Sequence, residues 1–228
     1  MIPFSPPLSE RDLMLHARAL DGMTVRELAR LLGRPLPTDA VHGKGLAGEL
    51  AELALGASAG STDRPDFIEL GVELKTIPVD ASGHVRESTY VCALDLGTVE
   101  REEWEGSRVR RKLARVLWLP VAWSPGEPPG ERRYGTARLW SPSSEEEEAL
   151  RADWLQLVGR IAVGGIDEVT AHMGQVLQIR PKAASGAART GARGPEGELL
   201  ETIPRGFYLR STFTERVLWS SLAASEAR

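Results

Sequence analysis

The sequence contains very little cysteine, with Cys92 as the only one in 228 residues. No disulfide can therefore form within the chain, and a zinc site made of several thiolates is excluded. The sequence also lacks an apolar run long enough to cross a membrane, and its first residues show no basic segment followed by a long apolar one. We therefore expect a cytoplasmic protein without membrane association.

An excess of positive charge is missing as well, because 28 Lys and Arg residues are outnumbered by 32 Asp and Glu residues. The net charge of -4 and the pI near 5.7 argue against binding of nucleic acid through overall charge. A local basic surface can still bind a phosphate backbone, because phosphates respond to the charges nearest to them. The charges are segregated along the chain, with a basic run over residues 108–115 and four acids over residues 145–148.

The strongest chemical signal is a short pattern in which Pro65-Asp66 is followed, after six residues, by Glu73-Leu74-Lys75. Side chains alternate between the two faces of a strand, so Glu73 and Lys75 share one face. On the same straight strand Asp66 would lie roughly 23 Å from Glu73, at about 3.3 Å per residue. The two carboxylates can meet only if the chain reverses between them, and Gly71 can adopt the positive φ that such a reversal needs.

Two carboxylates that converge on one point repel each other unless a divalent cation neutralises them. Oxygen ligands favour Mg²⁺ or Mn²⁺ over zinc, so we predict magnesium, with manganese as a substitute, held by Asp66, Glu73 and the Leu74 carbonyl. Such an ion activates a bound water, and the Lys75 ammonium can stabilise the charge that builds on a phosphate under attack. Taken alone, the spacing is equally typical of a solvated hairpin face.

Longer blocks around this pattern resemble one protein family. In chain order, the blocks are residues 56–61 and 66, Leu70 to Asp80, Val116 to Val121, Gln178 to Ala184 and Leu199 to Leu209. Through these blocks nearly the whole chain resembles the MutH family of methyl-directed mismatch-repair endonucleases, which belongs to the PD-(D/E)xK nucleases. The resemblance implies an α/β, restriction endonuclease-like fold, with a mixed β-sheet flanked by helices and two lobes around a DNA-binding cleft.

The resemblance also implies an activity. The expected substrate is double-stranded DNA with hemimethylated or unmethylated GATC sites. Hydrolysis that depends on Mg²⁺ would nick the unmethylated strand and leave 5′-phosphate and 3′-hydroxyl ends. MutL would activate the enzyme, with MutS acting through MutL. We expect a single endonuclease domain over residues 1–228, acting as a monomer, with most catalytic residues in a lobe of residues 1–110 and most DNA-reading residues in 111–228.

Two further residues gain catalytic roles from the resemblance. Glu52 matches an acid of the family's active site, although its position on a predicted helix is equally typical of a solvated face. Lys112 matches a second active-site lysine, and its alternative is a surface base that contacts phosphate. Removal of Lys112 should weaken cleavage under both interpretations, but only the first leaves DNA binding nearly intact.

The resemblance implies a set of DNA-contacting residues, namely Arg180, Pro181, Lys182, Gly206, Tyr208, Tyr90, Arg108 and Arg110. A Lys or Arg can pair with guanine O6 and N7, a contact that discriminates between bases by about 1 to 3 kcal/mol. Tyr208 matches the residue that senses the adenine N6 position, where a contacting hydroxyl leaves no room for a methyl group. Its alternative is an amphipathic core residue. The chain departs from the family at Tyr90, where phenylalanine is usual, and at Arg108, where histidine is frequent.

Local signals predict the remaining elements. Ser9 and Thr24 mark the starts of two helices, a third helix ends at Gly56, and Ser107 begins a basic helix. We also expect strands over 89–94, 116–123 and 207–209, a hairpin over 169–179, a long helix from Ser144, a loop over 183–197 that orders on DNA, and a last helix from Thr212.

Two other functions stay open. One is a type II restriction endonuclease that cuts both strands at GATC without a partner protein, using the same kind of catalytic residues. The other is a non-catalytic DNA-binding module that retains the fold. The intact set of Asp66, Glu73 and Lys75 argues against the second.

Overall fold

The structure is a computed structural model that describes residues 5–36, 45–58, 60, 63–182 and 187–220. The chain divides into two compact units. Unit 1 comprises residues 1–86, 114–141 and 217–228, and unit 2 comprises residues 87–113 and 142–216. This interleaved division differs from the expected break between residues 110 and 111. Two strands of unit 1 pair in parallel, which requires a long connection between them, and residues 87–113 of that connection fold as part of unit 2.

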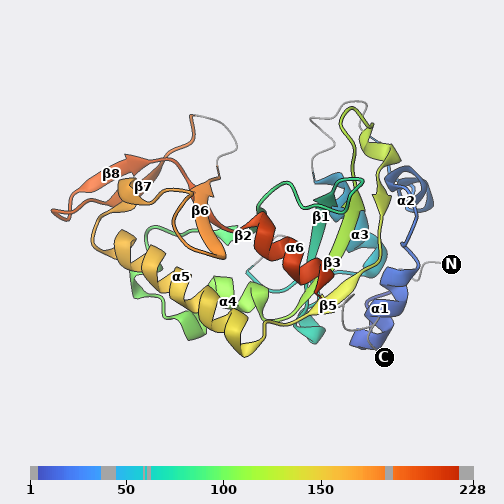
Figure 1. The fold of residues 1–228 in the computed structure, drawn as a ribbon, viewed down its shortest axis with the longest axis horizontal. Coiled ribbons are helices and arrows are strands. Elements are labelled where there is room, and N and C mark those ends of the chain that lie inside the picture. The colour runs from blue at the N-terminus through green and yellow to red at the C-terminus, as the bar shows by residue number, and fades with distance from the viewer. Residues whose placement is uncertain (1–4, 37–44, 59, 61–62, 183–186, 221–228) are drawn as a thin grey trace. The chain divides into compact units, whose positions relative to one another are not determined.

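Unit 1 combines helices with a mixed sheet, as predicted for the α/β class (Figure 1). Its elements are α1 (Glu10–Arg18), α2 (Val25–Leu31), α3 (Leu46–Leu55), η1 (Ile68–Leu70), β1 (Glu73–Val79), β3 (Val116–Ala122), η4 (Pro129–Glu131), β4 (Arg133–Tyr134) and β5 (Arg138–Trp140). Strand β3 runs parallel to β1 and antiparallel to β4 and β5. It is buried along almost its whole length, as the apolar sequence of residues 116–123 predicts.

The core of unit 1 lies between this sheet and the three N-terminal helices. Leu13 of α1, Leu28 of α2 and Leu50 of α3 are buried in one cluster with Leu74 of β1 and Leu117 of β3. The predicted helix signals are confirmed. The side chain of Ser9 accepts the Asp12 N–H, Thr24 forms a full capping box, and α3 ends at a left-handed glycine, Gly56.

Unit 2 contains an antiparallel sheet in which β9 lies between β2 and β6. Its elements are β2 (Thr89–Ala93), η2 (Val99–Arg101), η3 (Trp104–Gly106), α4 (Arg108–Leu113), α5 (Ser144–Ala162), η5 (Ile166–Glu168), β6 (Leu177–Pro181), β7 (Thr190–Arg193), β8 (Leu199–Thr202), β9 (Arg205–Leu209) and most of α6 (Ser211–Trp219). The capping residue of α5 is Ser143 rather than Ser144, because Ser143 and Glu146 form the capping box.

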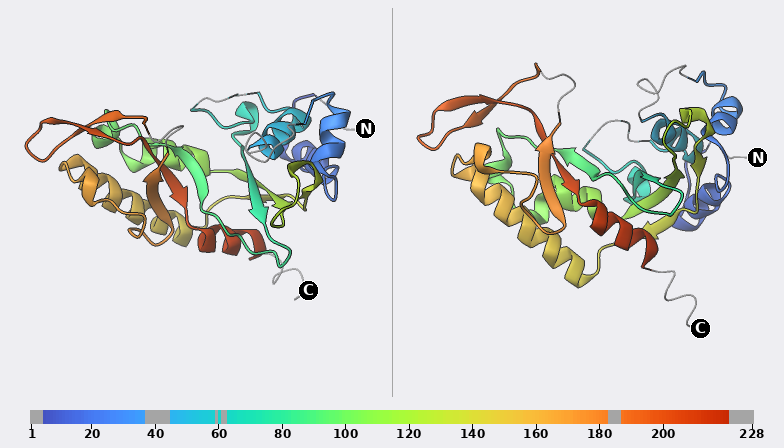
Figure 2. Two further views of the ribbon diagram at one scale, coloured as in Figure 1. Left: turned by 90° about the horizontal axis from the view of Figure 1, so that it is seen from above. Right: turned by 45° about the horizontal axis from the view of Figure 1, so that its top comes forward.

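Two predictions for unit 2 are wrong. Residues 169–171 do not pair with β6; the partner of β6 is β9, and the Val169 and Ala171 carbonyls instead accept hydrogen bonds from Arg205 and Arg210. The predicted loop over 183–197 contains β7, which pairs with β8 in a hairpin that extends from the sheet in both views of Figure 2. Residues 183–186 of that segment lie outside the described residues. None of the helices in the described part of the chain has the length and apolar character of a membrane span.

Candidate active site and nucleic-acid interface

A tight reversal brings Asp66 back to the start of β1. Phe67 and Val72 form an antiparallel bridge around the short helix η1, and Gly71 closes the turn with a φ of 65°. The Oδ2 atom of Asp66 accepts the Leu74 N–H at 2.7 Å. The predicted reversal is therefore confirmed, and the Asp66 carboxylate is fixed by a backbone donor of the strand itself.

Glu73 and Lys75 share a face of β1, as the two-residue alternation predicts. The Lys75 Nζ atom lies 2.7 Å from the Glu73 Oε1 atom, and only 13% and 5% of the two side chains are exposed. Leu74 points to the opposite face, where it joins the core. The strand therefore separates one charged face from one apolar face.

Helix α3 adds a third carboxylate to this region. Burial raises the pKa of Glu52 most, followed by the charges of Asp66 and Glu73, while Lys75 lowers it. The helix packs closely on β1, since a side chain at Gly48 would come within 3.2 Å of the Thr76 hydroxyl. We call Glu52, Asp66, Glu73 and Lys75 the carboxylate cluster, and unit 1 brings all four together.

The chemistry of the carboxylate cluster fits a hard divalent cation. Its acids outnumber its one ammonium. Burial is the main cause of the raised pKa of Glu52, and the charges of Asp66 and Glu73 add to it, so a cation would offset part of this effect. The described residues contain no group of three or more His, Cys, Asp or Glu side chains arranged to hold one ion. The donors available to a cation are therefore two carboxylates and a backbone carbonyl. Mg²⁺ usually completes such a small set of protein ligands with water and phosphate oxygens.

The predicted DNA-reading side chains gather on the sheet of unit 2. Tyr90 of β2 lies opposite Tyr208 of β9, with ring centroids 5.3 Å apart in an edge-to-face arrangement. The Arg180 guanidinium carbon lies 5.9 Å from the centre of the Tyr208 ring, and the Lys182 Nζ atom lies 4.4 Å from that of Tyr90. We call these four residues the aromatic-basic cluster.

Burial raises the pKa of Tyr90 to about 12 and also raises that of Tyr208, so both phenols are neutral at pH 7. A neutral hydroxyl can donate a hydrogen bond, as contact with a base edge requires. Pro181 and Lys182 are exposed, as is Arg180, whose guanidinium donates to Ser88, whereas Gly206 is buried beneath the cluster.

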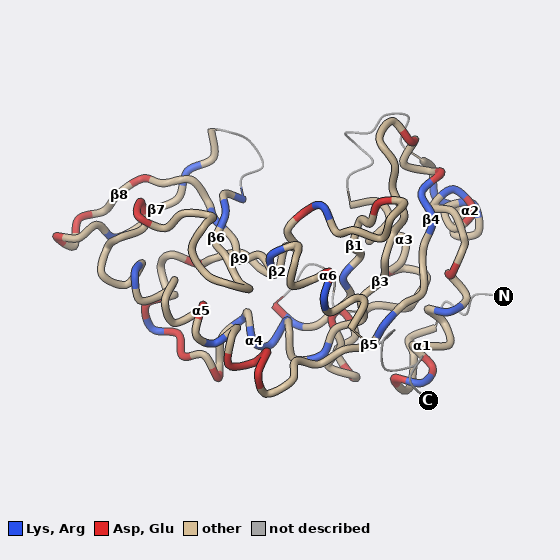
Figure 3. Tube along the Cα trace, viewed as in Figure 1, with Lys and Arg blue, Asp and Glu red and all other residues tan. Residues whose placement is uncertain are grey.

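The basic helix α4 holds the remaining predicted residues. Ser107 caps it, and Arg110 pairs with Glu147 at the acidic start of α5 at 2.7 Å. Figure 3 shows blue basic segments and red acidic segments close together in the region labelled α4. Arg110 is therefore already neutralised in part. Lys112 is only 7% exposed, which disfavours a surface base that contacts phosphate. Lys112 and Arg108 lie in unit 2, and their roles stay predictions.

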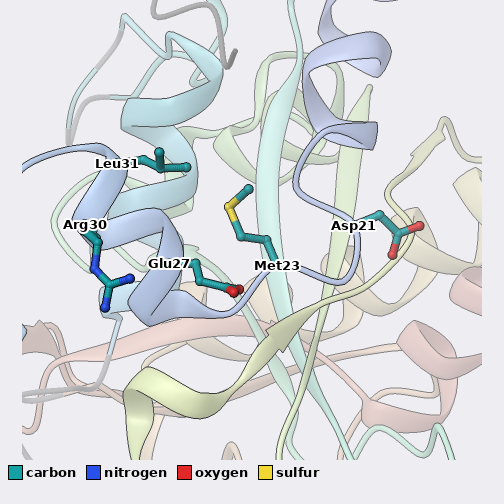
Figure 4. A pocket seen from close by; sticks show the side chains of 5 residues that line it. All are labelled: Asp21, Met23, Glu27, Arg30 and Leu31. Carbon is teal, nitrogen blue, oxygen red and sulfur yellow. The ribbon is translucent and has the colours of Figure 1, made fainter.

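A separate surface pocket lies beside α2 in unit 1 (Figure 4). It is lined by Asp21, Met23, Glu27, Arg30 and Leu31. Glu27 belongs to the capping box of α2 and so has a structural role. None of the predicted site residues lines this pocket.

Sequence reasoning overlooked two charged residues that support the aromatic-basic cluster. Asp153 of α5 accepts backbone N–H groups from residues just before and at the start of β6. Arg210, just after β9, donates to the carbonyls of residues 171 to 174. The sequence around Asp153 predicts a helix from apolar residues at helical spacing, but it does not predict the hydrogen bonds of Asp153. Their donors lie more than 20 residues further along the chain.

Comparisons with known proteins show the family of this chain. The family described as "DNA mismatch repair enzyme MutH" matches residues 55–153, which include Asp66, Glu73 and Lys75. The DNA mismatch repair protein MutH of Klebsiella pneumoniae (strain 342) is 49% identical over 214 residues, covering 94% of this chain and 93% of that protein. The proteins of the same name from Salmonella paratyphi B and Salmonella enteritidis PT4 are each 50% identical with the same coverage.

Proposed function

Because the chain belongs to the MutH family, we propose that it is a DNA mismatch-repair endonuclease of restriction endonuclease-like fold. It would nick the unmethylated strand of hemimethylated GATC sites in double-stranded DNA by hydrolysis that depends on Mg²⁺. MutL would activate it, with MutS acting through MutL, and the protein would act as a monomer. Apart from family membership, the observation that carries this proposal is the carboxylate cluster at the start of β1.

The cluster supports a hydrolytic mechanism. The Leu74 N–H holds Asp66 at 2.7 Å, so Asp66 needs little reorganisation to act as a ligand, together with Glu73 and the Leu74 carbonyl. When bound there, a magnesium ion would polarise the phosphoryl group and lower the pKa of a water. The Lys75 ammonium, which Glu73 orients at 2.7 Å, would hold the attacking water or stabilise the phosphate oxygen as negative charge develops. Glu52 would adjust the charge of the site from α3. The family resemblance implies an active-site role for Lys112 as well.

The aromatic-basic cluster supports sequence-specific binding. Lys182 and Arg180 are exposed bases of the kind that pair with guanine in the major groove. The Tyr208 hydroxyl would contact the adenine amino group and leave no room for a methyl group. Pro181, Gly206 and Tyr90 would shape the same surface, and Arg108 and Arg110 would contact phosphates.

Strand-specific nicking of a hemimethylated GATC duplex tests this function directly. In Mg²⁺ and with MutL, the wild type should cut only the unmethylated strand, and chelation of the metal should abolish cutting. Glu73→Ala should lose cleavage by a factor of at least about 10², the size of effect typical of one essential polar group, while it still binds the duplex. Glu69→Ala is a matched control, because Glu69 is an exposed acid in the same turn.

Three results would contradict the proposal in different ways. Full activity of Glu73→Ala would remove the metal assignment. Double-strand cutting without MutL would indicate a restriction enzyme. Absence of any metal-dependent cleavage in the presence of MutL would indicate a non-catalytic DNA-binding module.

A further inference from the structure

We propose that Tyr90 is a positioning residue for Lys182, and that Gly206 is needed because it lets these two side chains meet across the middle strand of the sheet. The inference rests on the proposed function, since it explains how Lys182 would be held ready to read a guanine. It adds a role for two residues that would otherwise count only as members of a DNA-contacting surface.

The strand order makes this contact unusual. Tyr90 is on β2, whereas Lys182 directly follows β6, and β9 separates the two strands. Adjacent strands lie about 4.8 Å apart, so β2 and β6 are separated by roughly 10 Å. A side chain from one outer strand reaches the other only if it lies flat over β9. The Tyr90 ring lies over β9 at Gly206, and the Lys182 ammonium lies 4.4 Å from the centre of the ring.

Gly206 is the point of β9 over which this contact forms. A Cβ atom at position 206 would lie 2.9 Å from Cε2 of the Tyr90 ring and 3.6 Å from Cβ of Lys182. It would also lie 2.9 Å from the backbone oxygen of Cys92, which cannot easily move because β2 pairs with β9. The pairing of β2 with β9 shifts register between Tyr90 and Cys92, next to this contact. Any side chain at position 206 would therefore push the ring away from Lys182.

The contact has a physical effect on Lys182. An exposed lysine has a long flexible chain, and holding its ammonium in one place costs conformational entropy. The face of an aromatic ring attracts the ammonium and limits the positions that it occupies. The same ring meets Tyr208 edge to face at 5.3 Å, so one side chain contacts both a guanine-reading and a methyl-sensing candidate. The attraction needs the ring and not the hydroxyl.

DNA binding of four variants tests the inference in Ca²⁺, which should support binding without cleavage. The variants are Tyr90→Leu, Tyr90→Phe, Lys182→Met and the double variant Tyr90→Leu/Lys182→Met. Tyr90→Leu should bind a GATC duplex roughly 2- to 30-fold more weakly, the range that corresponds to one cation–π contact. Tyr90→Phe should restore most of that loss. Tyr90→Leu should weaken binding by a smaller factor in the Lys182→Met background than in the wild type, because part of its effect acts through Lys182.

A duplex with 7-deazaguanine in place of guanine gives a readout that a purely structural role would not change. This duplex lacks the N7 acceptor, so the wild type should bind it more weakly than the normal duplex. Tyr90→Leu and Lys182→Met should bind the two duplexes with nearly equal affinity, because their contact with N7 is already impaired. The inference would be overturned if Tyr90→Leu weakened DNA binding by the same factor with and without Lys182. It would also be overturned if Tyr90→Phe bound DNA as weakly as Tyr90→Leu.

NMR on the folded wild type tests the contact even if Tyr90→Leu fails to fold. The chain has only four lysines, so ¹³C-lysine labelling gives a simple spectrum, and Lys182→Met identifies the Lys182 signal. The ring should shift the Lys182 ε-protons upfield, and Gly206→Ala should abolish the shift. Unshifted protons in the wild type would overturn the inference. Failure of the wild type to prefer GATC over a scrambled duplex would instead overturn the proposed function.

Discussion

Asp153 should be one of the most important side chains for the stability of unit 2. It is only 5% exposed, and its Oδ2 atom accepts the N–H groups of Gln175, Val176 and Leu177 at 2.8, 2.6 and 2.8 Å. These donors lead into β6, the strand that carries Arg180. A single carboxylate therefore fixes the path by which the chain enters the sheet that carries the proposed DNA-contacting residues.

The cost of removing this carboxylate can be worked from the structure. Asp153→Ala would leave the buried N–H groups of Val176 and Leu177 without their acceptor. Each buried donor that loses its partner costs about 1 to 3 kcal/mol, so the free energy of unfolding should fall by about 2 to 6 kcal/mol. Asp153→Asn keeps one carbonyl oxygen as an acceptor and should lose less than Asp153→Ala.

Urea unfolding followed by circular dichroism measures this loss. Glu145→Ala is the matched control, because Glu145 is an exposed acid on the same helix and should change stability by no more than about 0.5 kcal/mol. A loss below about 1 kcal/mol for Asp153→Ala would refute the reasoning, since it would mean that water replaces the carboxylate at these donors.

Three further predictions concern single contacts. Bidentate bonding to Arg115 lowers the pKa of Glu10, so this carboxylate stabilises the fold above its ordinary pKa of 4.5 and loses that effect as the pH falls through its lowered value. In urea titrations, Glu10→Gln should therefore lower the free energy of unfolding by up to about 1 kcal/mol at pH 7 and leave it unchanged at low pH. A difference between variant and wild type that does not change with pH would contradict this. Thr24→Ala should lower the free energy of unfolding by about 1 kcal/mol by removing a capping box, and an unchanged melting temperature would argue against it. Gly174→Ala should lower the free energy of unfolding by more than about 2 kcal/mol, because residue 174 has a φ of 79° and a Cβ there would clash with the backbone oxygen of Leu177. A variant as stable as the wild type would show that the turn relaxes freely.

Much of the carboxylate cluster could be predicted from sequence because its geometry is local. Strand alternation placed Glu73 and Lys75 on one face, and the need for a reversal pointed to Gly71, which has a φ of 65°. The Leu74 N–H that fixes Asp66 is eight residues along the same chain segment. Short-range sequence patterns determine which residues share a strand face and where a chain reverses, so both of these predictions are confirmed.

Pairings between distant segments could not be predicted in the same way. The apolar content of residues 176–179 predicts a strand, but it does not show that β9 is its partner. The Ala, Gly and Arg content of residues 183–197 is typical of a loop, and the pairing of β7 with β8 overrides that tendency. The contact of Tyr90 with Lys182 depends on strand order, which no local pattern encodes.

The pairing of Glu73 with Lys75 explains how the carboxylate cluster can fold before an ion binds. A carboxylate that is 3% exposed is costly unless a partner offsets its charge, and the Lys75 ammonium supplies one at 2.7 Å. Asp66 gains a donor from the backbone at Leu74. Burial raises the pKa of Glu52 most, and the charges of Asp66 and Glu73 raise it further. A cation that enters the cluster would lower the energy of ionised Glu52 as well as that of its ligands, so removal of the Glu52 carboxylate should weaken cation affinity.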